Sequence, residues 1–320
     1  MKTNPARLLI AAVAAAFALG NIAALAQTED QGQGLAIVTI LPKHPGDPAP
    51  NLSSPEIKLT VQGKQATVSS FKPRTGPQDL LEVVVLIDNS ARTSLGNQIE
   101  DIGQFIQHLP PSARVAVAYM QNGNSILTGP LTDDRTAVIK TLHIPGGAAG
   151  SNASPYFCLS DLAKRWPSQE PNARREVVMI TDGVDNYNRR YDPENPYVQA
   201  AIRDASRINL IVYSIFWRDR GFADNTQYAN NAGQNLLQQV SDATGGEFYG
   251  IGSGNPVSIG PYLDDLNRRL RNQYELSFLT RLHGKAEVQN MKFKLSVQGS
   301  SVDAPQQVFI YPQGSVQGLK

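Results

Sequence analysis

The chain has 320 residues, of which 41% are hydrophobic and 18% charged, and these proportions exclude wholesale disorder. At about 150 residues per domain, the length favours two domains. Because 29 basic residues face 28 acidic ones, no overall field draws the chain to nucleic acid or anionic lipid. A single cysteine and four histidines exclude a disulfide framework and a Cys/His zinc site.

Residues 1–26 have the features of a secretory signal peptide. Lys2 and Arg7 precede an apolar run from Leu8 to Leu19, and Ala24-Leu25-Ala26 supplies small residues at the positions that a signal peptidase reads. The run is shorter than the ~20 residues that span a bilayer. We therefore expect cleavage before Gln27 and export to the periplasm or the cell exterior, with no membrane span.

Both ends of the remaining chain carry short segments that alternate apolar and polar residues, which predicts strands with one buried face. The Gly-rich segment 27–34 is predicted to be a flexible lead-in. Because neither terminal set is large enough for its own core, we expect residues 35–79 to pair with 273–315 in one small β domain, with 316–320 as a tail. The predicted strands are 35–41, 57–61, 66–71, 274–280, 291–297 and 308–311.

The middle, residues 80–272, alternates strand and helix signals. Residues 81–87 are apolar except for Glu82, as in a parallel strand covered on both faces. Asn122-Gly123-Asn124 predicts a hairpin into an antiparallel edge strand. The pattern predicts an α/β fold with a doubly wound, mostly parallel sheet. The predicted strands are 81–87, 113–120, 125–128, 176–180, 210–216 and 247–249, and the predicted helices are 99–109, 133–142, 156–166, 198–208, 236–243 and 262–271.

Two aspartates follow the strands expected at the centre of this sheet. Ligands of doubly wound sheets bind at the carboxyl ends of the strands where the strand order reverses, which here are the strands ending at Asp88 and Asp182. Alone, Asp88 is more simply a loop or helix-capping acid. Two carboxylates in one crevice need a shared positive counter-charge, and with the Ser90 hydroxyl they are hard oxygen ligands suited to Mg²⁺ or Mn²⁺.

At these residues the sequence resembles the von Willebrand factor type A domain, over residues 80–272. Asp88-Asn89-Ser90-Ala91-Arg92 and Thr181-Asp182-Gly183 are similar to parts of its metal-ion-dependent adhesion site. The segments 245–249 and 270–276 resemble more specifically the secreted bacterial VWFA-related proteins common in Acidobacteria. The resemblance implies protein binding or adhesion, with Asp88, Ser90, Asp182 and a hydroxyl from the loop 146–155, for which Ser154 is the candidate, as metal ligands.

The motif departs from the family at Arg92, where the family has serine, and in the loop, which offers Ser151, Asn152 and Ser154 instead of a threonine. A guanidinium repels a neighbouring divalent cation and pairs well with carboxylates, so Arg92 disfavours Mg²⁺ or Mn²⁺ and is a candidate cation substitute. Three arrangements stay open: a metal site, an ion pair of Arg92 with Asp88 or Asp182, and a weak site with Arg92 in solvent.

The loops after the third and fourth predicted parallel strands are rich in aromatic and arginine residues, the types that anchor protein interfaces. We expect about half of them to order the loops and the rest to contact a partner. The predicted partner-binding residues are Tyr187, Arg189, Arg190, Tyr191, Trp217 and Phe222.

The sequence thus predicts an exported, non-enzymatic interaction module with a degenerate metal site and an unidentified protein partner. The alternatives are a Mg²⁺- or Mn²⁺-dependent phosphoesterase and a structural envelope protein with a vestigial site. The phosphoesterase is weaker because the second acid of an Asp-x-Asp nucleophile is replaced by Ser90. No P-loop, Gly-x-Ser-x-Gly or His-Glu-x-x-His motif occurs in the sequence.

Overall fold

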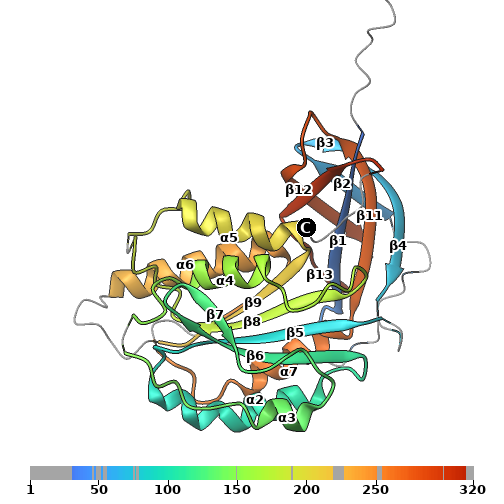
Figure 1. The fold of residues 1–320 in the computed structure, drawn as a ribbon. Helices are drawn as coiled ribbons and strands as arrows, with labels where there is room; N and C mark the ends of the chain where they lie inside the picture. The colour runs from blue at the N-terminus through green and yellow to red at the C-terminus, as the bar shows by residue number, and fades with distance from the viewer. Residues whose placement is uncertain are drawn as a thin grey trace, which may run out of the picture.

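The computed structural model describes residues 31–44, 47, 52, 56–74, 76, 79–148, 150–188, 190–218, 227–250, 254–297 and 299–314. The predicted signal peptide and tail, and the predicted partner residues Arg189 and Phe222, lie outside these ranges. No helix in the described ranges is both long and apolar enough to cross a membrane. The described chain builds two sheets, of which the first has helices on both faces (Figure 1).

The first sheet has the strand order β10-β9-β8-β5-β6-β7. All its neighbours pair in parallel except β7, which returns beside β6 through the predicted hairpin at Asn122 and Gly123, both with positive φ. This confirms the predicted fold class, a mostly parallel sheet with one antiparallel edge strand. The strands are β5 (Leu81–Asp88), β6 (Ala113–Gln121), β7 (Asn124–Leu127), β8 (Arg174–Thr181), β9 (Leu210–Phe216) and β10 (Phe248–Tyr249).

Helices cover both faces of this sheet, with α4, α5 and α6 on one side and α2, α3 and α7 on the other (Figure 1). Each side has its own apolar core, and every residue of β5 and β8 is buried, because these central strands are covered twice. The helices are η2 (Thr93–Gln98), α2 (Ile99–His108), α3 (Arg135–Ile139), α4 (Pro155–Lys164), α5 (Pro196–Arg207), α6 (Gln227–Thr244) and α7 (Gly260–Leu270).

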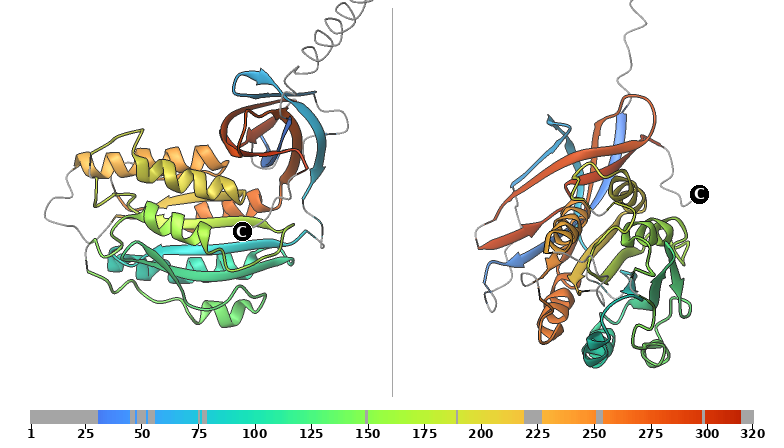
Figure 2. Two further views of the ribbon diagram at one scale, coloured as in Figure 1. Left: turned by 45° about the horizontal axis from the view of Figure 1, so that its top comes forward. Right: turned by 90° about the vertical axis from the view of Figure 1, so that its left-hand side faces the viewer.

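The second sheet is antiparallel, and both ends of the chain contribute to it, as predicted. Its order is β3-β2-β12-β14-β1-β11-β4, with β13 paired to β1, and it curves around a separate core at the end of the α/β unit where β5 begins (Figures 1 and 2). The short β13 had no sequence prediction. The strands are β1 (Gln31–Pro42), β2 (Glu56–Val61), β3 (Lys64–Gln65), β4 (Thr67–Pro73), β11 (Gln273–Arg281), β12 (Glu287–Ser296), β13 (Ser300–Asp303) and β14 (Gln307–Pro312).

The predicted flexible lead-in is wrong for residues 31–34, which pair with β11 as the start of β1. The two glycines of this segment, Gly32 and Gly34, allow close packing instead of flexibility. A Cβ on Gly34 would lie 2.3 Å from the Phe278 ring, and one on Gly32 would lie 2.5 Å from Ile310. The strand therefore excludes side chains at these two positions, and composition alone did not indicate this.

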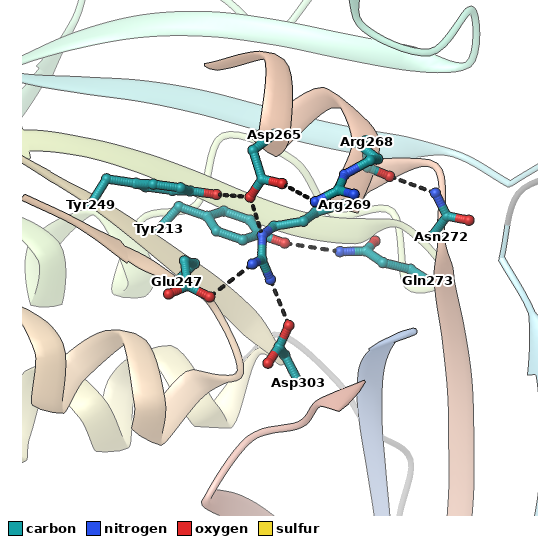
Figure 3. Close-up of polar contacts among 9 residues, drawn as sticks. All are labelled: Tyr213, Glu247, Tyr249, Asp265, Arg268, Arg269, Asn272, Gln273 and Asp303. Atoms are coloured by element: carbon teal, nitrogen blue, oxygen red, sulfur yellow. Dashed lines mark hydrogen bonds and ion pairs between the residues drawn. The ribbon is translucent and has the colours of Figure 1, made fainter. Parts of the chain in front are cut away.

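An arginine from α7 links the two sheets. Arg269, whose side chain is 10% exposed, pairs with Asp265 at 2.7 Å, with Glu247 at 2.8 Å and with Asp303 at 2.6 Å. Asp265 and Glu247 belong to the α/β unit, whereas Asp303 ends β13 of the other sheet (Figure 3). Figure 3 also shows Tyr249 donating to Asp265, at 2.8 Å. One guanidinium thus holds carboxylates of both units together.

Candidate functional site

The strand order reverses between β5 and β8, which are parallel neighbours. Asp88 is the last residue of β5 and Thr181 the last of β8, so Asp88 and Asp182 follow adjacent strand ends, as the sequence predicts. Helix α6 packs on the turn after β8 so closely that a Cβ on Gly233 would lie 2.2 Å from the Asp182 carbonyl oxygen. Both aspartates are almost fully buried, at 1% exposure for Asp88 and 3% for Asp182.

Four hydrogen bonds from neutral groups surround the Asp88 carboxylate. Oδ1 accepts from the Ser90 backbone N–H at 2.9 Å and from Ser90 Oγ at 2.7 Å. Oδ2 accepts from Asn152 Nδ2 and from Thr181 Oγ1, each at 2.7 Å. We call Asp88, Ser90, Asn152 and Thr181 the Asp88 cluster. All four residues are buried.

Burial raises the pKa of Asp88, and the hydrogen bonds from Ser90, Thr181 and Asn152 oppose that rise. An ionised carboxylate has about four lone-pair positions, and four donors fill them here. The negative charge of Asp88 is therefore stabilised by the dipoles of hydroxyl, amide and backbone groups.

These residues do not fit a cation bound directly by Asp88, because a metal would have to displace one of four short hydrogen bonds. In the described part of the chain, no three acidic, histidine or cysteine side chains gather where they could hold a metal. The second predicted acid, Asp182, accepts from the Val184 N–H at 2.9 Å. The Ser154 Oγ is buried and hydrogen-bonds to no described residue.

The Arg92 guanidinium is not among the donors to Asp88. Residue 92 is the N-cap of η2 and is exposed, and its backbone N–H donates to the Arg218 carbonyl at 3.2 Å. The cluster instead depends on two residues that the sequence analysis did not single out as ligands of Asp88. Thr181 lies next to the predicted Asp182, and Asn152 lies in the loop 146–155, for which the sequence analysis favoured Ser154 as the ligand.

The loop before α4 is tied onto the end of β5. The Gly147 N–H donates to the Asn89 carbonyl at 2.9 Å, and a Cβ on Gly147 would lie 2.8 Å from that same oxygen. The loop then places Asn152 beside Asp88, and Asn152 Oδ1 accepts from Asn186 Nδ2 at 3.1 Å. The glycines thus permit close approach of two backbones, and the chain of contacts continues from Asp88 into the loop after β8.

Among the described residues after β8 and in α6, four tyrosines are exposed. Tyr187 is 67% exposed, Tyr191 42%, Tyr197 39% and Tyr228 57%. Tyr187 and Tyr197 both contact the Phe157 ring, with centroids 5.0 and 4.7 Å away, and Tyr228 Oη accepts from the Tyr191 N–H at 3.2 Å. We call these four residues the tyrosine surface.

Asp185 fixes the backbone that carries this surface. Its Oδ1 accepts from the Tyr187 N–H at 3.0 Å, and its Oδ2 accepts from Asn195 Nδ2 at 3.2 Å. Asn195 Oδ1 in turn accepts from the Tyr197 N–H at 2.9 Å, at the start of α5. One buried aspartate therefore holds both ends of the loop 185–197.

The prediction that Trp217 contacts a partner is wrong, because its side chain is only 2% exposed and lies in the core between the sheet and α2 and α7. The residue directly follows β9, and its large apolar area favours burial where a helix layer is available. Of the other predicted partner residues, Tyr187, Arg190 and Tyr191 are exposed. Residue type alone therefore did not distinguish the buried Trp217 from the exposed residues.

No family model and no curated protein matches the chain. Among solved structures, it is similar to an aerotolerance-related membrane protein from Bacteroides fragilis, with 16% identity and a TM-score of 0.41 over 59% of this chain and 98% of that one. It is also similar to a von Willebrand factor type A protein from Catenulispora acidiphila, with 11% identity and a TM-score of 0.42 over 92% and 77%. A third is proximal thread matrix protein 1 from the mussel byssus, solved with a zinc-occupied MIDAS motif, with 10% identity and a TM-score of 0.41 over 67% and 50%.

Proposed function

We propose that this protein is an exported, non-enzymatic interaction module of the type A kind, which binds another protein through the tyrosine surface. In this proposal the Asp88 cluster organises the loops beneath that surface and recognises no partner through a metal. We also propose that the chain is related to the secreted bacterial VWFA-related proteins.

The observation that carries the proposal is the exposure of four tyrosines, three of them in the segment 185–197, whose backbone Asp185 and Asn195 hold, and the fourth, Tyr228, in α6. Tyrosine combines a large apolar area with few rotatable bonds, so it contributes contact area at low entropic cost. Phe157, Asp185 and Asn195 fix the tyrosine-bearing backbone before binding, which lowers the ordering cost that association would otherwise carry. The exposed Arg190 adds a charged group of the type common at such interfaces.

Photo-cross-linking in cells of the producing organism tests the proposal. A photoreactive phenylalanine analogue replaces Tyr187 or Tyr191, and in a matched control it replaces Gln65, which is exposed on the other sheet. We expect a discrete adduct of one size from both tyrosine positions and none from position 65. Mass spectrometry of the adduct then identifies the partner.

Two further variants decide how the surface works. Tyr228→Ser in the Tyr187 cross-linking background should weaken the adduct while leaving the circular dichroism spectrum and melting temperature unchanged, because Tyr228 is largely exposed. Asp185→Ala should weaken it through the loop backbone. Adducts that are equally strong at position 65, or that survive Tyr191→Ser and Tyr228→Ser together in the Tyr187 cross-linking background, would refute the proposal.

A further inference from the structure

A pocket of about 250 Å³ lies at the edge of the α/β sheet, beside β6 and α3 (Figure 1). The pairing of β6 with the chain that returns after β7 is interrupted there. The Thr128 N–H donates to the Val117 carbonyl at 2.9 Å, and pairing resumes only as a single bridge between Val115 and Thr132. We call this gap the edge pocket, and it is lined by Ala116, Val117, Thr128, Gly129, Pro130, Thr132, Ala137, Val138 and Thr141.

The lining of the edge pocket is apolar in character. None of its nine residues is ionisable, and its three threonine hydroxyl groups already contact the protein. Thr128 Oγ1 lies 2.8 Å from Thr141 Oγ1, which donates to the Val138 carbonyl at 2.7 Å. Thr132 Oγ1 accepts from the Asp134 N–H at 3.2 Å. With these hydroxyl groups engaged, the side chains of the lining offer a ligand mainly methyl and methylene groups.

The edge pocket has a buried floor and an exposed rim. Ala116 and Val117 of β6 are each only 1% exposed, whereas Pro130 and Ala137 are exposed. Gly129 of the lining borders open space, because no heavy atom lies within 4 Å of a Cβ built on it. A ligand can therefore enter from solvent and reach apolar groups of the sheet.

An exposed isoleucine continues this apolar surface beyond the rim. Ile126 of β7 is 48% exposed and lies two residues before Thr128, so both face the same side of the strand. Water in a pocket with few available polar partners is poorly held, and its displacement by an apolar group favours binding. The volume is also suitable, because apolar cavities of ~150 Å³ bind molecules of the size of benzene.

We propose that the edge pocket binds a small, uncharged, apolar molecule of the size of one aromatic ring or a short hydrocarbon chain. Contact with apolar groups drives this binding. A charged ligand is disfavoured, because it would lose hydration without gaining an ionic partner from the lining. The ligand contacts β6, α3 and the segment 128–132 together, so it stabilises the folded edge of the sheet. The edge pocket shares no residue with the tyrosine surface and is independent of the function proposed for that surface.

Methyl NMR spectroscopy of the full chain tests the proposal with toluene, benzoate and benzylamine, which share one ring and differ in charge. We expect toluene to shift the methyl resonances of the lining residues saturably, with a Kd of about 1 mM or tighter. Benzoate and benzylamine should bind at least about tenfold more weakly, because the lining offers neither charge a partner. Lining resonances that toluene leaves unchanged, or equal binding of either charged probe, would overturn the proposal.

Two variants with matched controls localise the binding. Gly129→Leu adds an apolar side chain where the lining borders open space, and Ala137→Glu adds a charge at the rim. Each should weaken toluene binding at least about tenfold. Gly254→Leu and Thr136→Glu make the same changes at exposed positions outside the lining and should retain the wild-type affinity. Both glutamates lie in the first turn of α3, where the helix dipole favours an acid, so this pair of variants separates the pocket from the helix. Wild-type affinity in both lining variants would overturn the assignment.

Discussion

Asn152 Nδ2 donates a 2.7 Å hydrogen bond to Asp88 Oδ2 across 64 positions of sequence. The amide therefore occupies a position on the carboxylate that a cation would otherwise take. Because Asn152 Oδ1 also accepts from Asn186, the same side chain connects the buried acid to the loop that carries the tyrosine surface.

Replacing this amide by an acid should create a metal requirement. Asn152→Asp places a second carboxylate against Asp88, and like charges in a buried site lower the free energy of unfolding at neutral pH. We expect Mn²⁺ or Mg²⁺ to restore part of that loss in urea unfolding. Asn152→Ala should cost about 1.5–3 kcal/mol, typical of a hydrogen bond to a charged group, with no response to metal. A variant Asn152→Asp that is as stable as the wild type would contradict this prediction.

The two fully buried glutamates of the central strands should respond in opposite ways to neutralisation. Glu176 faces Gln273 and Tyr213, but these bond to each other at 3.2 Å, and neither carboxyl oxygen has a partner of hydrogen-bond geometry in the described chain. Glu82 Oε2 accepts from Trp166 Nε1 at 2.7 Å and lies beside Arg114 and Arg175. Glu176→Gln should therefore stabilise the protein at pH 8, and Glu82→Gln should destabilise it.

The raised pKa of Glu176 determines how the free energy of unfolding changes with pH. The folded carboxyl keeps its proton up to a pKa of about 8, whereas the unfolded one releases it near 4.5. Between these values the folded state binds more protons, so the free energy of unfolding falls as pH rises, with a limiting slope of about 1.4 kcal/mol per pH unit. Urea unfolding from pH 5 to 8 should show this fall in the wild type and a flatter profile in Glu176→Gln. Parallel profiles would exclude Glu176 as its source.

Arg269 should be far more important for stability than its neighbour Arg268. Removal of Arg269 leaves Asp265, Glu247 and Asp303 without their shared cation (Figure 3), and loss of a largely buried partner costs about 3–5 kcal/mol. Arg268 contacts the same Asp265, but its side chain is 38% exposed, so Arg268→Gln should cost at most about 1 kcal/mol. Calorimetry of Arg269→Gln should also show the two units melting less cooperatively. Equal melting temperatures for the two variants would disprove the link.

Gly34→Ala should destabilise the β sheet. The added methyl group would overlap the Phe278 ring and force a shift in the packed core, which typically costs about 1–3 kcal/mol. Gly129→Ala is the control, because no heavy atom lies within 4 Å of a Cβ built at that position. Chemical denaturation of both variants measures the difference, and a Gly34→Ala protein as stable as Gly129→Ala would show that β1 is not closely packed.

Periodicity was sufficient for the α/β fold. The buried run 81–87 and the hairpin at 122–124 fixed a parallel sheet with an antiparallel edge, and the strand ends placed Asp88 beside Asp182. These features depend on local patterns that repeat every two or three to four residues. The alternating strands at both chain ends likewise indicated the shared β sheet, although the short β13 lacks a pattern long enough to detect.

The chemistry of the site depended on contacts that no local pattern contains. The four donors to Asp88 come from three separate segments, and Asn152 reaches it from a loop without regular spacing. Trp217 is buried in one of the two cores of the α/β unit, whereas Tyr187 lies exposed on the loop after β8, and residue type alone does not distinguish the two. Glu82 and Glu176 interrupt otherwise apolar strands, and only the fold shows that one has hydrogen-bond partners and the other does not.

The claim that neutral donors, and no cation, satisfy Asp88 is tested most directly by the melting temperature of EDTA-treated protein during titration with Mg²⁺ and Mn²⁺. We predict the same melting temperature as in sodium chloride of equal ionic strength, because all four lone-pair positions of the carboxylate are occupied from within the protein. A saturable rise with either metal that disappears in Asp88→Asn would contradict the account.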